Sequence, residues 1–145
     1  MSTSLREQIL LRMQAALLGN TGAGSNVFRA RETSITRDIC PAIVLMPNAE
    51  SDEDFGMNVD RHELMIDVEI FIRGDPWDAL ADPVATDAHK VLMTDALLLA
   101  LISRIRKISS GWEGEEADRT AGVLTMRYRV RYLTKASNIS DSIIL

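Results

Sequence analysis

The side chains with most catalytic potential in this chain are one cysteine, Cys40, and two histidines, His62 and His89. A cysteine beside a histidine base is a pairing that nucleophilic catalysis uses. Cys40, however, precedes the rigid Pro41 in an expected strand, and no loop suited to an oxyanion hole is evident around it. Neither histidine belongs to a metal-binding motif such as His-Glu-x-x-His or Cys-x-x-Cys. We therefore predict no catalytic and no metal-binding residues and expect both histidines at the surface. A small enzyme that uses Cys40 is kept as a less favoured alternative.

Two segments have the composition of ligand sites but lack the rest of the pattern. Residues 19–25 resemble a phosphate-binding loop, yet they follow a predicted helix rather than a strand and contain no lysine. Residues 50–54 carry four carboxylates but lack the 12-residue calcium loop with its closing glutamate. We predict a flexible connector for the first and a solvated acidic loop for the second, and leave open whether the acidic loop binds a divalent cation. No cofactor is predicted.

Charge and composition argue against several classes of protein. The 145 residues carry 16 Lys and Arg against 21 Asp and Glu, a formal net charge of −5, so the overall field does not favour a general nucleic-acid binder. Aromatic residues make up 5%, too few for a sugar-stacking platform. The longest apolar run, residues 96–102, is far shorter than the roughly 20 residues of a membrane span, and no targeting signal is visible. A single cysteine cannot form an internal disulfide, which fits a reducing compartment.

Hydrophobic periodicity predicts one α+β domain over residues 1–134 and a C-terminal tail over residues 135–145. Ser4 and Glu7 form a capping box before the first helix, and Asp82-Pro83 is a start signal for the second. The predicted elements, in the order α-β-β-β-α-β, are a helix at 5–17, strands at 27–31, 39–46 and 64–72, a helix from 82 to about 108, and a strand at 123–132. We expect one mixed or antiparallel twisted sheet of about four strands, with the two helices packed on one face.

The two longest predicted strands each have an apolar face and a charged face. Asp67 and Glu69 lie on the outer face of the first strand. Arg127, Arg129 and Arg131 lie on the outer face of the second. The tyrosines of the second strand face the core, so they and the arginines do not form a stacking platform for nucleic acids. We predict instead that the carboxylates offset the arginines, either within one sheet or across a subunit boundary.

The predicted second helix is apolar on two sides. Its core stripe consists of Val84, Val91, Leu98, Ile102 and Ile105. Met93, Leu97 and Ala100 fall at the same helical spacing on nearly the opposite side. Because exposed aliphatic side chains are unfavourable in water, we predict that this second side contacts a neighbouring subunit.

Three segments of this pattern, in this order of elements, resemble the tail terminator proteins of long-tailed bacteriophages, the lambda-type minor tail protein U family. The segments are Pro41-Ala42-Ile43-Val44, Asp67-Val68-Glu69-Ile70-Phe71-Ile72 and Met126-Arg127-Tyr128-Arg129-Val130-Arg131-Tyr132. The resemblance covers about residues 4–134. The Gly-rich connector before Val27 and the segment from Lys135 to Leu145 have no place in the family pattern.

The resemblance implies a function carried by interfaces, with no enzymatic activity. In that family, small α+β subunits form a six-membered ring that caps the tail tube, ends its polymerisation and offers the surface on which the head docks. The implied partners are further copies of this chain, the major tail tube protein and head–tail connector proteins, with DNA only as cargo passing through the ring and no membrane. The implied location is the virion tail, assembled in the bacterial host cytoplasm. The alternative within the same class is a head–tail connector or tail-completion protein of that junction.

Overall fold

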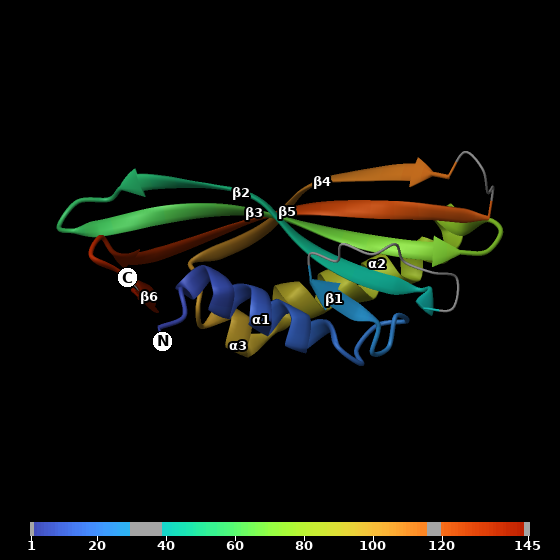
Figure 1. The fold of residues 1–145 in the computed structure, drawn as a ribbon, viewed down its shortest axis with the longest axis horizontal. Helices are drawn as coiled ribbons and strands as arrows, with labels where there is room; N and C mark the ends of the chain where they lie inside the picture. The colour runs from blue at the N-terminus through green and yellow to red at the C-terminus, as the bar shows by residue number, and fades with distance from the viewer. Residues whose placement is uncertain (1, 30–38, 116–119, 144–145) are drawn as a thin grey trace.

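The computed structural model describes residues 2–29, 39–115 and 120–143, which form helices and a curled sheet (Figure 1). The helices are α1 (Leu5–Leu17), α2 (Trp77–Thr94) and α3 (Ala96–Leu99). The strands are β1 (Val27–Arg29), β2 (Ala42–Asp54), β3 (Val59–Arg73), β4 (Arg104–Gly114), β5 (Ala121–Lys135) and β6 (Asn138–Ser142). The chain is α+β, as predicted, but it contains more elements than the predicted α-β-β-β-α-β order.

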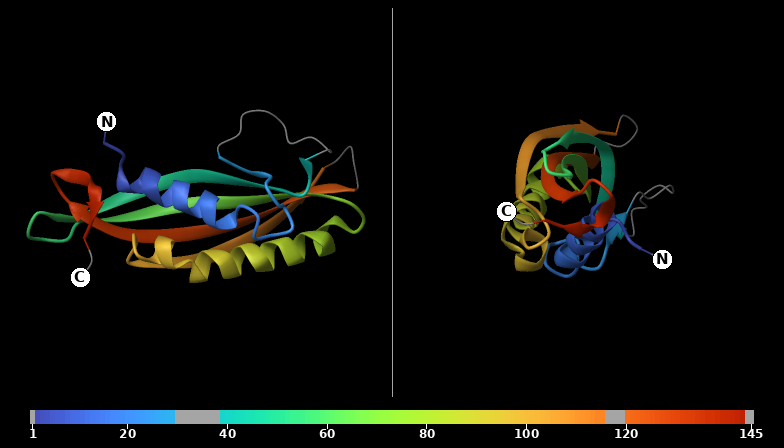
Figure 2. Two further views of the ribbon diagram at one scale, coloured as in Figure 1. Left: turned by 90° about the horizontal axis from the view of Figure 1, so that it is seen from below. Right: turned by 90° about the vertical axis from the view of Figure 1, so that its left-hand side faces the viewer.

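The strands form one mixed sheet in the order β1-β2-β3-β5-β4, with β6 paired to the end of β5. β1 runs parallel to β2, and the other neighbouring strands are antiparallel. The predicted sheet of about four strands lacked β4 and β6. The helices lie together on one side of the sheet (Figures 1 and 2).

Burial confirms the alternation of the two long strands. β3 and β5 pair along their whole lengths, from Val59 opposite Lys135 to Arg73 opposite Ala121. Their inner-face residues are all buried: Leu64, Ile66, Val68, Ile70, Ile72, Leu124, Met126, Tyr128, Val130 and Tyr132. From the helical side, α1 adds Leu5, Ile9, Met13 and Leu17. The Ser4 hydroxyl accepts the N–H of Glu7 at 3.1 Å, which confirms one half of the predicted capping box. The Glu7 carboxylate does not reach back to Ser4, because it binds Arg29 of β1 instead.

The helix predicted from residue 82 to about residue 108 is wrong at both ends. α2 begins at Trp77 and ends at Thr94. Asp95 interrupts it, because its carboxylate accepts the Leu98 N–H at 2.9 Å and caps the short helix α3. The chain then enters β4, where Ile105 is buried opposite Val130. Buried residues three apart, such as Ile102 and Ile105, also fit a helix, so periodicity alone did not separate the two structures.

β2 continues through the end predicted at Pro47-Asn48 and through the acidic loop predicted at residues 50–54. Among the described residues, β1 pairs only with residues 43–45, so no described strand pairs with that edge of β2 beyond them, and a proline without an N–H is tolerated there. Residues 50–54 pair with residues 60–64 of β3. The acidic run is therefore strand rather than loop.

Among the register shifts of the described strands, those in β2 and β4 are β-bulges at the same level of the sheet. The register of β2 shifts after Pro47, and the register of β4 shifts after Lys107. The residues opposite these two positions, Ile66 and Tyr128, are themselves partners at the centre of the sheet. A bulge adds one residue to a strand and increases its local twist. The strands accordingly cross near the middle of the molecule in Figure 1.

Residues 138–142 form strand β6 rather than an appended tail. Ser142 pairs with Thr134 of β5, and Nε2 of Gln8 in α1 donates to the carbonyl oxygen of Ser140 at 2.9 Å. The domain boundary predicted at residue 134 therefore falls inside the sheet. At the other edge, the strand predicted at 27–31 is β1 as far as Arg29, and residues 30 and 31 lie outside the described residues. No helix in the described ranges is long and apolar enough to cross a bilayer.

Candidate functional site

The outer face of the sheet brings together part of the predicted charged set. Asp67 on β3 lies directly opposite Arg127 on β5, whose Nε and Nη2 atoms donate to the two carboxylate oxygens at 2.8 and 3.1 Å. Asn48 Nδ2 donates to the same carboxylate at 3.2 Å. The hydrogen bond from Arg127, more than any other contact, holds the pKa of Asp67 below its ordinary value against the opposing effect of partial burial.

Two further residues of the predicted charged set, Arg131 and Glu69, do not form an ion pair with each other. Nε of Arg131 donates at 2.7 Å to Glu63, a carboxylate that the predicted set did not include. Glu69 lies opposite Thr125, and burial, followed by the negative charge of Asp67, raises the pKa of Glu69. Glu63 could have been found from the sequence, because it has the same parity along the strand as Asp67 and Glu69.

Strand β4 places further arginines beside those of β5. Arg104 lies directly opposite Arg131, and Arg106 lies directly opposite Arg129. The side chains of Arg104, Arg106 and Arg129 make no ion pair or hydrogen bond with the part of the chain that the structure describes. We call these three residues the arginine face. Like charges at opposed positions destabilise a sheet, so an external anion would be favourable here. The arginine face was not predicted because β4 had been assigned to a helix.

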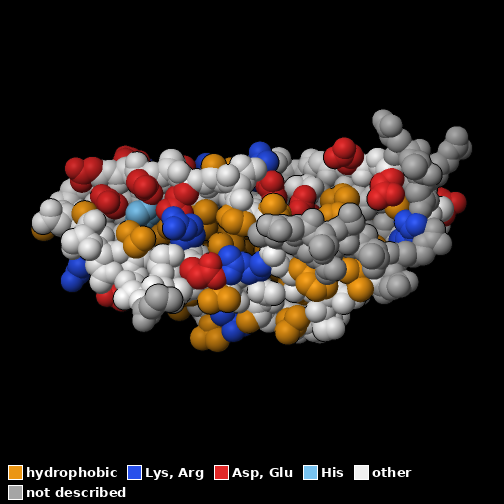
Figure 3. Space-filling view, viewed as in Figure 1, with side chains coloured by type: hydrophobic (Ala, Val, Ile, Leu, Met, Phe, Trp, Pro, Cys, Tyr) orange, Lys and Arg blue, Asp and Glu red, His pale blue; other side chains and the backbone are white. Residues whose placement is uncertain are grey.

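Met93, Leu97 and Ala100 do not form one stripe, because α2 ends between the first and the second. Met93 is half-buried against the core, whereas Leu97 in α3 is 62% exposed and Ala100 is the exposed C-cap of α3. Leu99, which was not predicted, is 41% exposed on the same short helix. We call Leu97 and Leu99 the α3 leucine pair. Figure 3 shows hydrophobic side chains exposed on the helical side of the molecule.

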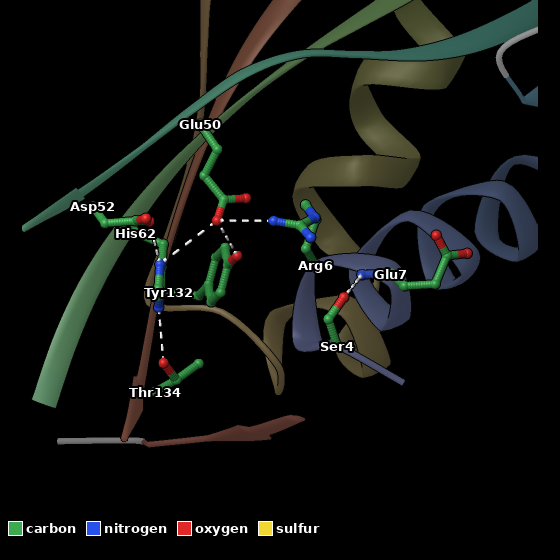
Figure 4. A network of polar contacts seen from close by, with 8 residues as sticks. All are labelled: Ser4, Arg6, Glu7, Glu50, Asp52, His62, Tyr132 and Thr134. Carbon is green, nitrogen blue, oxygen red and sulfur yellow. Dashed lines mark hydrogen bonds and ion pairs between the residues drawn. The ribbon is translucent and has the colours of Figure 1, made fainter. Parts of the chain in front are cut away.

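A polar network joins the ends of β2, β3 and β5 (Figure 4). Nδ1 of His62 lies 2.5 Å from Oδ1 of Asp52, and its Nε2 lies 2.8 Å from Oγ1 of Thr134. The Tyr132 ring stacks on the imidazole with 4.6 Å between centroids, and the Tyr132 hydroxyl donates to Oε1 of Glu50 at 2.9 Å. Burial, supported by this bond to Glu50, raises the pKa of Tyr132, so the phenol is a neutral donor at ordinary pH.

The expectation that both histidines lie at the surface is wrong. His62 is 4% exposed, because β3 begins at Val59, upstream of its predicted start, and places His62 on the same inner face as Leu64. His89 on α2 is half-buried, and its Nδ1 lies 2.7 Å from the hydroxyl of the buried Tyr128.

The bulge in β2 brings the two carboxylates to His62. Before the bulge, the inner-face residues of β2 have odd numbers, for example Leu45 opposite Val68. After it they have even numbers, with Glu50 opposite Leu64 and Asp52 opposite His62. Without the extra residue, both carboxylates would lie on the outer face of the sheet.

Neither nucleophilic arrangement in the described residues is suited to catalysis. Thr134, His62 and Asp52 are connected in the order of nucleophile, base and orienting carboxylate, but Thr134 is 0% exposed, so its hydroxyl is out of reach of a substrate. For Cys40, burial raises the pKa of the thiol, against the opposing effect of Arg73, so the reactive thiolate is disfavoured. The His62 network is therefore better suited to fixing the sheet or to binding a ligand through its carboxylates than to nucleophilic attack.

No protein-family model matches the chain, and no curated protein matches it either.

Proposed function

We propose that the protein is a structural subunit of a bacteriophage tail, a tail terminator that forms a head-to-tail ring, hexameric as in the family it resembles, on the end of the tail tube. The three segments that carry the resemblance lie on the adjacent strands β2, β3 and β5. Ile43 of the first segment lies opposite Ile70 of the second, and Val68 of the second lies opposite Met126 of the third. The segments therefore form one continuous area of sheet, so the residues that carry the resemblance lie together in the folded chain.

The observation that carries the ring proposal is the exposure of the α3 leucine pair. Two leucines on a four-residue helix gain the free energy of burial only when another molecule covers them. In a head-to-tail ring, each subunit uses two different surfaces, one toward each neighbour. We assign the α3 leucine pair, bordered by Met93 and Ala100, to one contact between copies of the chain.

The charged outer face of the sheet supplies the second kind of surface. Asp67 and Arg127 neutralise each other, and Glu63 neutralises Arg131. The arginine face has no such partner among the described residues, so it can receive acidic groups of the tube protein or of a neighbouring copy. In this role the protein caps the tube, ends its growth and receives the head without turnover of a substrate, and DNA only passes through the ring.

The oligomeric part of the proposal is tested by light scattering across a concentration series. The parent protein should gain mass toward a ring as its concentration rises, whereas Leu97→Glu should remain small and keep the parent's melting temperature. Leu80→Glu is the matched control, because Leu80 is 46% exposed but lies on α2, away from the α3 leucine pair. The same mass for Leu97→Glu and the parent at high concentration would contradict the assigned contact.

The terminator role is tested with a polymerising tail tube protein. Addition of about one ring per tube should shorten or cap the tubes, with a ring visible at one end by electron microscopy. Phage that lack the protein should make overlong tails that do not join heads. Tails of normal length that fail only in head joining would instead favour the head–tail connector or tail-completion protein, and normal joining would remove both proposals.

A further inference from the structure

Three potential metal ligands converge where the ends of β2 and β3 meet (Figure 4). They are an imidazole nitrogen of His62 and one carboxylate oxygen each from Glu50 and Asp52, and these atoms lie within 4.8 Å of one another. No other group of this kind occurs among the residues that the structure describes. We propose that these three side chains bind a divalent transition metal ion, with Zn²⁺ as the best match. This site goes beyond the ring function and does not depend on it.

His62 is held in the orientation that a metal ligand needs. Its Nε2 is hydrogen bonded to Thr134 Oγ1, which is fully buried, and its ring stacks on Tyr132. Nδ1 therefore faces the carboxylates, at 2.5 Å from Asp52 Oδ1 and 3.6 Å from Glu50 Oε1. Metal-binding histidines use one ring nitrogen for the metal and the other for a hydrogen bond to an oxygen that fixes the ring. Thr134 is the positioning residue here.

Glu50 brings a largely buried carboxylate to the site. Its side chain is 14% exposed, and its Oε2 atom is buried with no hydrogen-bond partner in the described part of the chain. Figure 4 shows Oε2 pointing away from His62 and Asp52, so a metal would bind at Oε1 and add a positive charge beside a largely buried carboxylate. Arg6 approaches the other oxygen, Oε1, at 3.4 Å, and its side chain is 44% exposed. It can therefore move into solvent when a metal supplies the positive charge.

The donor set selects the class of metal. Magnesium and calcium prefer sites made of oxygen alone, whereas one imidazole nitrogen with carboxylates suits zinc and its neighbours in the transition series. Asp52 is 61% exposed, which leaves an open side for entry of the ion and for a water molecule as the fourth ligand. The ion would bridge β2 and β3 at the end of their pairing and hold the two strands together.

The test uses the full chain, freed of metal with a chelator, and titrates it with Zn²⁺ by calorimetry and with Co²⁺ by visible absorption. We expect one ion per chain, Co²⁺ bands of four-coordinate intensity that Zn²⁺ abolishes, and a melting temperature that rises with the Zn²⁺ concentration. Asp52→Asn should weaken Zn²⁺ binding by at least about tenfold, as the loss of a ligand requires. Glu53→Gln is the matched control, because Glu53 is 64% exposed on the same strand but points to the outer face, and this variant should bind as the parent does.

A second pair of variants separates the histidines. His62→Gln should abolish the Co²⁺ bands, and His89→Gln should leave them unchanged. Equal Zn²⁺ affinity in the parent and in Asp52→Asn, or bands that depend on His89, would overturn the site. Equal binding of Mg²⁺ and Zn²⁺ would overturn the assignment to a transition metal. If His62→Gln does not fold, the comparison of Asp52→Asn with Glu53→Gln decides the matter.

Discussion

The carboxylate of Asp67 accepts two hydrogen bonds from the guanidinium of Arg127, its direct partner across the two long central strands. Glu69 lies two residues further along the same strand and on the same face, but it is opposite Thr125 rather than an arginine. Folding therefore shifts the pKa values of the two carboxylates in opposite directions. The pKa of Asp67 is lowered mainly by Arg127, and the pKa of Glu69 is raised mainly by burial.

Asp67→Asn should lower the melting temperature at pH 7 by roughly 2–4 °C, the scale of one ion pair in a domain of this size. Because the pKa of Asp67 is lower in the folded protein than in the unfolded chain, its contribution is complete above the unfolded value of about 4 and is lost as the pH falls through the folded value. The difference between variant and parent should therefore shrink in acid. Calorimetric melting between pH 7 and pH 2.5 checks this, and a constant difference would contradict it.

Glu69→Gln should change stability in the other direction and raise the melting temperature at pH 7. The raised pKa means that the folded protein disfavours the ionised carboxylate, a cost that is complete above the folded pKa and disappears below the unfolded value of about 4.3. The gain should therefore vanish as the medium is acidified. The same melting series measures it, and a Glu69→Gln protein less stable than the parent at pH 7 would show that Glu69 has a favourable partner.

Val68→Asp should unfold the protein, whereas Met65→Glu on the opposite face of the same strand should be tolerated. Val68 is 0% exposed, and an unpaired buried charge costs several kcal/mol, comparable to the whole stability of a domain. Met65 lies opposite Arg129 on the outer face, where a carboxylate gains an opposite charge. Circular dichroism and thermal melting compare the two variants. A Val68→Asp protein that melts within a few degrees of the parent would contradict the assignment of Val68 to the buried inner face of β3.

Gly122→Ala should destabilise the end of the sheet near α2 and disturb Trp77. A Cβ at residue 122 would lie 2.3 Å from the Trp77 ring, so the indole has to move, and overpacking of this kind costs about 1–3 kcal/mol. Gly111→Ala is the control, because no atom of the described residues lies within 4 Å of a Cβ there. Fluorescence in a Trp112→Phe background reports on Trp77, and unchanged emission in Gly122→Ala would contradict this packing.

Arg129→Gln should be more stable than the parent, and Arg127→Gln less stable. Arg129 faces Arg106 across the two strands and has no carboxylate partner in the described residues, so its removal relieves repulsion. Arg127 is the partner of Asp67. Chemical denaturation at low salt should show the opposite signs, and both effects should weaken in high salt because exposed charges are screened.

Local patterning was enough to predict the faces of the two long strands. In the segments from Leu64 to Ile72 and from Leu124 to Tyr132, strict alternation leaves one arrangement that buries the apolar residues. The first helix was predictable for a similar reason, since the Ser4 cap lies at its start and one apolar face runs from Leu5 to Leu17.

Strand β4 and the His62 network could not be predicted in this way, because both depend on pairing between distant residues. The segment after Asp95 fits a helix by spacing, and its pairing with β5 makes it a strand. Asp52 reaches His62 only because β2 gains one residue at its bulge, and nothing local marks that residue as extra. A change of one residue in register exchanges the two faces of the strand, so the alternation pattern alone places Glu50 and Asp52 on the wrong face and does not predict the network.

The hydrogen bond between Gln8 and Ser140 has a consequence for how the protein is made. The two residues are separated by 132 positions, and a ribosome that adds about 5–20 residues per second needs roughly 7–26 s to pass from one to the other. Throughout that interval α1 lacks the contact with β6 that Gln8 makes in the folded protein. Helix α1 therefore gains its contact with β6 only after the whole sheet between them has been synthesised.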